Sequence, residues 1–146
     1  MRSTWLRFTA GLLGLLLGLV PGVLPGVLPM PARAQDAAEG ATLYQWYCAT
    51  CHGLDGTGKG PMAPALLVQP VDLTGLGASE GGEFPLLRVV RRIDGSDPLV
   101  SHGSGMPVYG PLFQGDEVAL KTASGQPVLM GRAVADLVLY LQEIQK

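Results

Sequence analysis

The chain has 146 residues, a length that fits one domain rather than two. Its ten lysines and arginines are outnumbered by twelve acidic residues, which gives a formal net charge of −2. No basic stripe exists that could meet a phosphate backbone, so nucleic acid is excluded as a partner.

The N-terminus has the three parts of an export signal. Two early arginines supply the positive charge, and an apolar stretch follows over residues 8–20. Ala32 and Ala34 are the small residues that a signal peptidase reads. We therefore predict a signal peptide over residues 1–34, cleaved after Ala34.

An uncleaved membrane anchor is the alternative, because the apolar run through Met30 is nearly long enough to span a bilayer. The prolines between residues 21 and 31 argue against one continuous helix, since each lacks a backbone N–H and restricts the residue before it. Cleavage leaves residues 35–146 as a single domain. That domain has 7 basic and 12 acidic residues, and thus a net charge of −5.

Residues 36–48 are predicted to form the first helix, because their alanines, leucine and tyrosines have good or acceptable helix propensity. Asp36 lies near its positive end. Gly40, Tyr44 and Cys48 recur every four residues and so share one face. A glycine within a helix costs about 1 kcal/mol relative to alanine, which indicates that another backbone approaches at Gly40.

This helix leads into Cys48-Ala49-Thr50-Cys51-His52, which has the C-x-x-C-H spacing of a c-type haem attachment site. Each thiol can add across one haem vinyl group to form a thioether, and the adjacent imidazole then reaches the iron from one side. The chain has only two cysteines and two histidines, and this pentad contains three of the four. The sequence therefore predicts one haem c per chain, bound through Cys48 and Cys51, with His52 as an axial ligand of the iron.

The pentad and the export signal support each other, because bacteria attach haem c outside the cytoplasm. We expect the mature domain in the periplasm, or facing it if the N-terminal segment remains as an anchor. A membrane is a partner only in that second case. Two cysteines at this spacing can also form a disulfide in an exported protein, but the thioethers would consume both.

The glycines and prolines of residues 53–72 predict a long loop, and those of residues 101–110 predict another. So long an irregular segment is unusual in a small domain unless something else fills the core, as a haem would. Between the two loops, residues 83–94 predict a second helix, with Pro85 in its first turn and Gly95 closing it.

The C-terminal part is predicted to contain a short hairpin at residues 118–129 and then the clearest helix, over residues 131–145. Apolar side chains recur there with a period of 3.6 residues, at Val134, Leu137, Val138, Leu141 and Ile144. The predicted fold class is all-α, with three main helices and Gly/Pro-rich loops wrapped around one covalent haem.

This order resembles the class I c-type cytochromes, a family of small monohaem proteins. The resemblance covers essentially all of residues 35–146 and is carried by Gly40, Tyr44, the pentad with Gly53, Pro64, Met106-Pro107, Leu137 and Tyr140. In that family the first and last helices cross with a glycine against an aromatic residue, which implies Gly40 and Tyr140 at the crossing. The resemblance also implies that the carbonyl of Pro64 accepts the Nδ1–H of His52. Residues 111–128 depart from the family because they are longer and more polar than usual.

The second axial ligand must reach the iron from the side opposite His52. We predict Met106, because the glycines of its Gly-Ser-Gly-Met-Pro loop let the backbone approach the ring edge. His102 is the rival, since imidazole also binds iron well. Met62 lies only ten residues after His52 and would reach the wrong face, and Met130 is expected to pack in the core. Thioether sulfur favours ferrous iron, so this ligand pair predicts a fairly high reduction potential.

Two further groups of residues surround this predicted site. Arg88, Arg91 and Arg92 share a face of the middle helix and would form a basic patch for a haem propionate or a redox partner, unless they are simply a solvated helix face. Tyr109 and Trp46 are predicted to pack in the haem pocket rather than to relay electrons.

The leading hypothesis is an electron-transfer protein, not an enzyme, that binds no small-molecule substrate and serves a dehydrogenase, an oxidase or a reductase. The alternative is a haem enzyme or gas-binding protein whose sixth ligand can be displaced. A third reading treats Cys48 and Cys51 as a thiol redox pair or half of a metal site. It lacks both a βαβ pattern and a second cysteine pair.

Overall fold

The computed structural model describes residues 34–98 and 105–146. Residues 1–33 of the predicted signal peptide therefore lie outside the described residues, and His102 does too. Among the residues described, no helix has the length and apolar character needed to cross a bilayer.

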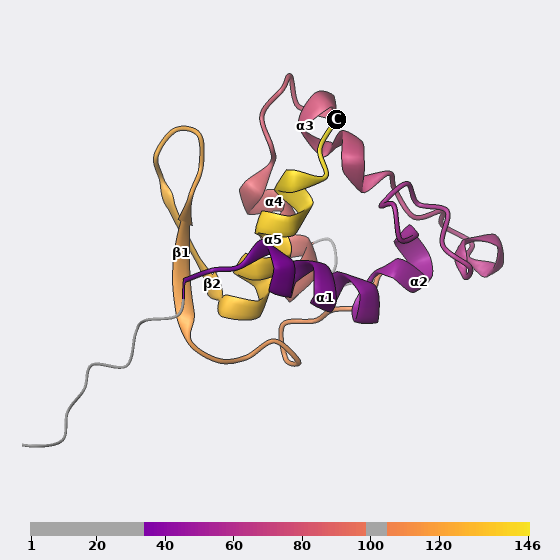
Figure 1. Cartoon of the computed structure of the whole chain (residues 1–146), viewed down its shortest axis with the longest axis horizontal. Coiled ribbons are helices and arrows are strands. Elements are labelled where there is room, and N and C mark those ends of the chain that lie inside the picture. Colours follow the sequence, from indigo (N-terminus) through magenta and orange to yellow (C-terminus); the bar gives the residue numbers. More distant parts are fainter. Residues whose placement is uncertain (1–33, 99–104) are drawn as a thin grey trace, which may run out of the picture. The chain divides into compact units, whose positions relative to one another are not determined.

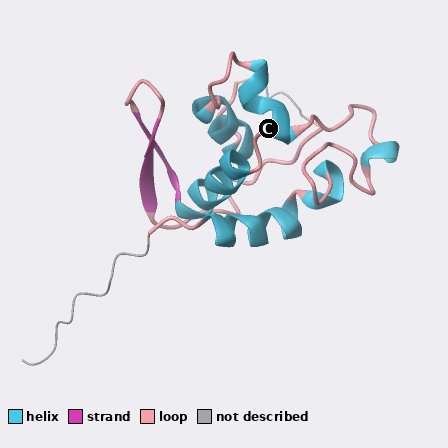
Figure 2. Cartoon of the chain, turned by 45° about the horizontal axis from the view of Figure 1, so that its top comes forward, coloured by secondary structure: helices cyan, strands magenta, loops and turns pink. Residues whose placement is uncertain are grey.

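The described part of the chain is mostly helical, with one small two-stranded sheet (Figures 1 and 2). The three longest helices are α1 (Ala37–Tyr47), α4 (Leu86–Asp94) and α5 (Arg132–Glu143), and they correspond to the three predicted from the sequence. The shorter elements are α2 (Ala49–His52), α3 (Leu76–Ser79), the 3₁₀ turns η1 (Ala63–Ala65) and η2 (Leu73–Gly75), and the strands β1 (Glu117–Lys121) and β2 (Pro127–Gly131).

Helix α1 packs across α5, and Gly40 makes the close approach possible. The Asp36 side chain caps α1 by accepting a hydrogen bond from the backbone N–H of Ala38 at 2.8 Å. Gly40 is buried, and a Cβ atom added there would overlap the backbone carbonyl of Asp136 on α5. The predicted approach of another backbone at Gly40 is therefore confirmed.

The aromatic residue expected at this crossing lies one turn further along. The ring of Tyr140 packs against that of Tyr44, with the ring centroids 5.1 Å apart and the planes tilted by 48°. Tyr44 is only 1% exposed, and Leu137 between the two helices is equally buried. Gly40 thus faces backbone, while the aromatic contact joins Tyr44 to Tyr140.

Helix α4 begins at Leu86, three residues later than predicted, because Pro85 serves as the residue that precedes its first turn. The helix ends at Gly95, whose φ of 85° lies in the left-handed region that favours glycine. Its backbone N–H donates to the carbonyl of Arg91. The predicted closing glycine is confirmed.

The predicted loop over residues 53–72 contains no element longer than the η1 turn. It folds back on itself through backbone hydrogen bonds, including Gly58 N–H to the His52 carbonyl at 2.8 Å and Leu73 N–H to the Gly56 carbonyl at 2.7 Å. Gly58 has a φ of 79°, and a Cβ there would meet the carbonyl of Pro70. The loop therefore brings residues 70–73 alongside the end of the pentad.

The predicted hairpin is also confirmed, and it spans residues 117–131 rather than 118–129. Strands β1 and β2 pair antiparallel, with Val118 opposite Met130 and Leu120 opposite Val128. Val128 and Met130 are buried in the core, so one face of the sheet covers apolar side chains. Both views show the hairpin at one side of the helices (Figures 1 and 2).

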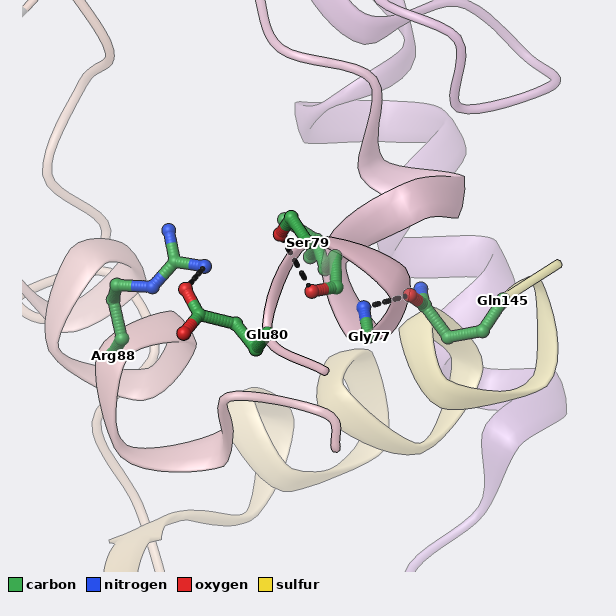
Figure 3. A network of polar contacts seen from close by, with 6 residues as sticks. Gly77, Ser79, Glu80, Arg88 and Gln145 are labelled. Atoms are coloured by element: carbon green, nitrogen blue, oxygen red, sulfur yellow. Dashed lines mark hydrogen bonds and ion pairs between the residues drawn. The ribbon is translucent and has the colours of Figure 1, made fainter. Parts of the chain in front are cut away.

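The short helix α3 is tied to the end of the chain and to α4 (Figure 3). Gly77 N–H donates to Gln145 Oε1 at 2.9 Å, and Gln145 Nε2 donates to the Leu73 carbonyl at 2.7 Å. Glu80, directly after α3, forms an ion pair with Arg88 at 2.9 Å. These contacts hold the segment between the long loop and α4 in place.

We expect Gly40→Ala to destabilise the holoprotein by about 1–3 kcal/mol, the usual cost of overpacking. This cost exceeds the gain in helix propensity of about 1 kcal/mol, because the added methyl would meet the Asp136 carbonyl. Urea unfolding measures the change. Gly75→Ala is the control, since nothing lies within 4 Å of a Cβ at that position. Equal stability of Gly40→Ala and the unsubstituted protein would contradict this packing.

Candidate functional site

A cavity of about 320 Å³ is lined by residues from the end of α1, α2, the long loop, α4, α5 and the segment after residue 104. Both cysteines of the pentad line this cavity, together with His52 and Met106. The structure therefore brings together two thiols, an imidazole and a thioether that the sequence placed at the predicted site.

His52 is 8% exposed, and its ring orientation is fixed by the long loop. Its Nδ1 lies 3.1 Å from the backbone carbonyl oxygen of Val71, and since a carbonyl can only accept, Nδ1–H is the donor. Burial lowers the pKa of the imidazole, and the Val71 contact opposes this shift. A neutral ring protonated at Nδ1 leaves the Nε2 lone pair as the metal-binding atom.

The expectation that Pro64 supplies this carbonyl is wrong. Pro64 is exposed in the η1 turn, twelve residues after His52, and the carbonyl contact is made instead by Val71, seven residues later. The physical reason is the path of the loop. The hydrogen bond from Leu73 N–H to the Gly56 carbonyl draws residues 70–73, rather than the η1 turn, beside the imidazole.

Cys48 and Cys51 do not form a disulfide in the structure. Burial raises the pKa of the Cys48 thiol to about 11, with a smaller contribution from Cys51. A thiol with so high a pKa is protonated near neutral pH, whereas reactive redox thiols have lowered pKa values. This shift argues against the thiol redox pair considered from the sequence.

Met62, Met106 and Met130 occupy three different environments. Met106 is partly buried and lines the cavity. Met62 is 45% exposed in the loop before η1, and Met130 is 4% exposed in the core opposite Val118 on the neighbouring strand. The prediction that Met130 packs in the core is confirmed, and Met106 lines the same cavity as His52.

Two aromatic rings, those of Tyr47 and Tyr109, line one side of the site, and Phe113 packs against both. Tyr109 lines the cavity as predicted, and its hydroxyl donates to the Tyr47 carbonyl at 2.8 Å. The ring of Tyr109 stacks on Phe113 with centroids 5.5 Å apart, and Phe113 also packs edge-on against Tyr47 at 5.2 Å. Phe113 lies in residues 111–128, the segment that is longer and more polar than usual in class I c-type cytochromes. This segment therefore supports the site through the packing of Phe113.

Trp46 was expected in the pocket but is 77% exposed. The residue next to it, Tyr47, lines the cavity instead. The sequence contained the signal, because Tyr44, Tyr47, Cys48 and Cys51 follow the i, i+3, i+4, i+7 spacing of one helical face, and Trp46 does not. Counting that spacing would have replaced Trp46 with Tyr47.

The arginines of α4 separate into two groups. Arg88 and Arg92 line the cavity, while Arg91 is exposed. Arg88 pairs with Glu80 at 2.9 Å, and Arg92 pairs with Asp97 at 3.4 Å. Of the three arginines, only Arg88 and Arg92 reach the cavity, and the role of a basic patch stays a prediction.

The family model described as cytochrome c matches residues 37–145. The chain therefore belongs to the cytochrome c family, whose members bind covalently attached haem c and transfer electrons through it. Comparison with curated proteins and with solved structures gave no significant match.

The residues around the cavity fit a haem c. Two thiols at the attachment spacing, an imidazole whose Nδ1–H is already engaged and a thioether sulfur all border one cavity. The remaining lining includes apolar side chains such as Leu76, Val89 and Leu137, which suit a large flat apolar ring.

Tyr44 generates a prediction about alkaline stability. Its hydroxyl donates to the Gly53 carbonyl at 2.6 Å, and burial raises its pKa well above the ordinary value of about 10. As pH rises past 10, the unfolded chain loses this proton first, so the native state binds more protons and stability falls. This contribution is complete below pH 10 and is lost as pH rises toward the native pKa.

We expect Tyr44→Phe to cost about 1–3 kcal/mol near neutral pH, because the Gly53 carbonyl loses its donor. The same variant should show a shallower loss of stability above pH 10. Urea unfolding of the holoprotein from pH 7 to the alkaline range tests both effects. Parallel pH profiles for the two proteins would contradict the assignment of Tyr44 as a source of the alkaline loss.

Proposed function

We propose that this protein is a periplasmic electron carrier whose single haem c is bound through Cys48 and Cys51, with His52 and Met106 as axial ligands. The observation that carries the proposal is the cavity, because all four side chains border it. The family shown above supports the haem and the electron transfer, and the cavity supports the ligand pair.

The haem, when bound, supplies an iron centre that exchanges one electron. The chain contributes the environment that sets how readily the exchange occurs. The Met106 sulfur is a soft donor that favours ferrous iron, and apolar lining disfavours the extra charge of the ferric state. Both effects raise the reduction potential.

The residues around the proximal ligand keep its geometry constant through the exchange. The Val71 carbonyl holds the His52 ring in one orientation, and Tyr44 closes the turn after the pentad through its hydrogen bond to Gly53. A fixed imidazole reduces the rearrangement that accompanies each electron. The protein then needs no open coordination site and no substrate of its own, in contrast to a haem enzyme or gas-binding protein.

We further propose that its partners are redox proteins, such as a dehydrogenase, an oxidase or a reductase. The mature domain has a net charge of −5 before the haem is counted. Encounter with a partner is then expected to depend on ionic strength, because surface charges steer association.

Met106→Ala is the decisive test of the ligand pair. Oxidised holoprotein should show the weak long-wavelength absorption band that reports sulfur bound to ferric iron, and Met106→Ala should abolish it and lower the reduction potential. Met62→Ala is the matched control, since Met62 is a solvent-exposed methionine of the same chain. A pyridine haemochrome assay confirms that each variant holds covalent haem.

The alternatives give different results in the same experiment. Absence of this band from the unsubstituted protein, with a reduction potential that changes in His102→Ala but not in Met106→Ala, would assign the histidine as the ligand. Rapid binding of carbon monoxide to the reduced, unsubstituted protein would instead favour the enzyme or gas-binding function, which needs a displaceable sixth ligand.

The proposed location is tested by the N-terminus of the mature protein. We expect purified holoprotein to begin at Gln35 and to be released with the periplasmic fraction, because the residues before Gln35 have the features of a cleaved signal. Mass spectrometry measures the cleavage site. Recovery of full-length chain in the membrane fraction would establish the anchored form instead.

A further inference from the structure

Two arginines stand among the cavity-lining residues that the structure describes, and both come from α4. Arg88 and Arg92 are four residues apart, so their Cβ atoms lie on one face of the helix, about 5–6 Å from each other. Val89 and Ile93 are buried and line the same cavity. Helix α4 therefore presents apolar surface and a pair of cations to one cavity.

The two arginines lie where the cavity meets solvent. Their side chains are 52% and 41% exposed, whereas Val89 and Ile93 beside them are 8% and 6% exposed. Haem likewise has an apolar part and a charged part. Its ring is apolar, and it has two propionate groups side by side on one edge, which remain most stable at the boundary with water or against cations.

A guanidinium is the side chain whose geometry best matches a carboxylate, because its N–H groups form a planar fork. Two adjacent propionates can therefore be met by two guanidinium groups at helical i, i+4 spacing. Arg88 and Arg92 line the cavity, whereas Arg91 is not among its lining residues.

The position of α4 is consistent with the chemistry of the ring. The propionates lie on the edge of the ring opposite the two vinyl groups. The vinyl groups would join Cys48, which directly precedes α2, and Cys51, which lies within it. Figures 1 and 2 both show α4 apart from α2. The cysteines and the arginines thus line the same cavity from separate elements. This separation is what a ring needs if its vinyl edge is attached to the cysteines and its propionate edge contacts the arginines.

Each arginine also contacts a carboxylate of the chain, and this contact orients it. Arg88 Nη2 lies 2.9 Å from Glu80 Oε1, and Arg92 Nη2 lies 3.4 Å from Asp97 Oδ2. A guanidinium has five N–H donors, so one ion pair leaves others for a second carboxylate. Figure 3 shows the other terminal nitrogen of Arg88 directed away from Glu80.

We propose that Arg88 and Arg92 bind the two haem propionates, with Glu80 and Asp97 as positioning residues for the guanidinium groups. The inference rests on the haem occupying this cavity, as in the proposed function. The arginines compensate the propionate charge and, as cations near the iron, favour the ferrous state. The cavity thus selects two of the three arginines that share the helix as cofactor-binding residues.

The test uses holoprotein matured in cells that are fed 5-aminolevulinate with a ¹³C-labelled carboxyl group, which labels the haem propionates. Redox difference infrared spectra then isolate the propionate carboxylate bands. We expect Arg88→Gln and Arg92→Gln each to shift a labelled band. Each should also decrease the equilibrium constant for haem reduction by roughly threefold to tenfold, where tenfold corresponds to about 59 mV for one electron.

Arg91→Gln is the matched control, because it removes the same charge from the same helix on an exposed position. It should leave the labelled bands in place. If a glutamine variant fails to mature, Arg88→Lys and Arg92→Lys keep the charge without the planar fork, and the band shift alone is expected.

Two results would overturn the inference in distinguishable ways. Labelled bands that do not move in the Arg88 and Arg92 variants, in protein that retains haem and sulfur coordination, reject the propionate contacts and leave the proposed function intact. An unsubstituted protein that binds no haem rejects both.

Discussion

The packing of α1 on α5 is the constraint on which the haem site depends. At Gly40 the two helices approach closely enough that a side chain would meet the backbone of Asp136. The pentad begins directly after α1, so the crossing determines where both cysteines and His52 lie relative to α5. Leu137 and Leu141 of α5 then form part of the cavity wall. One glycine thus connects the packing of the terminal helices to the position of the proposed iron ligands.

The cavity itself makes the fold depend on its cofactor. The cavity of about 320 Å³ is lined by apolar side chains such as Leu76, Val89 and Leu137. Without the haem these side chains would lack an apolar partner, and covering them is favourable. The long loop over residues 53–72 is tolerable for the same reason, because the haem supplies apolar surface that its glycines and prolines do not.

The sequence predicted the elements and the haem-attachment pentad because those features depend on local patterns. The caps of α1 and α4, the hairpin and the pentad are all determined by residues close together in the chain. The acceptor for His52 is different. It depends on the path of a loop held by backbone hydrogen bonds such as that from Leu73 to Gly56, and no side-chain pattern encodes that path. The choice of Pro64 therefore failed, whereas the error at Trp46 was avoidable from helical spacing.

The charges around α4 show how a protein of net negative charge can still favour a reduced iron. Coulomb interactions decrease with distance and are screened in water, so nearby groups outweigh the −5 of the mature domain as a whole. Glu80 and Asp97 partly offset the charges of Arg88 and Arg92, but neither carboxylate is among the residues that line the cavity. If the proposed ligands and propionate contacts form, the arginines, the Met106 sulfur and the apolar wall would all raise the reduction potential. The acidic surface would then act mainly on encounters with the proposed redox partners.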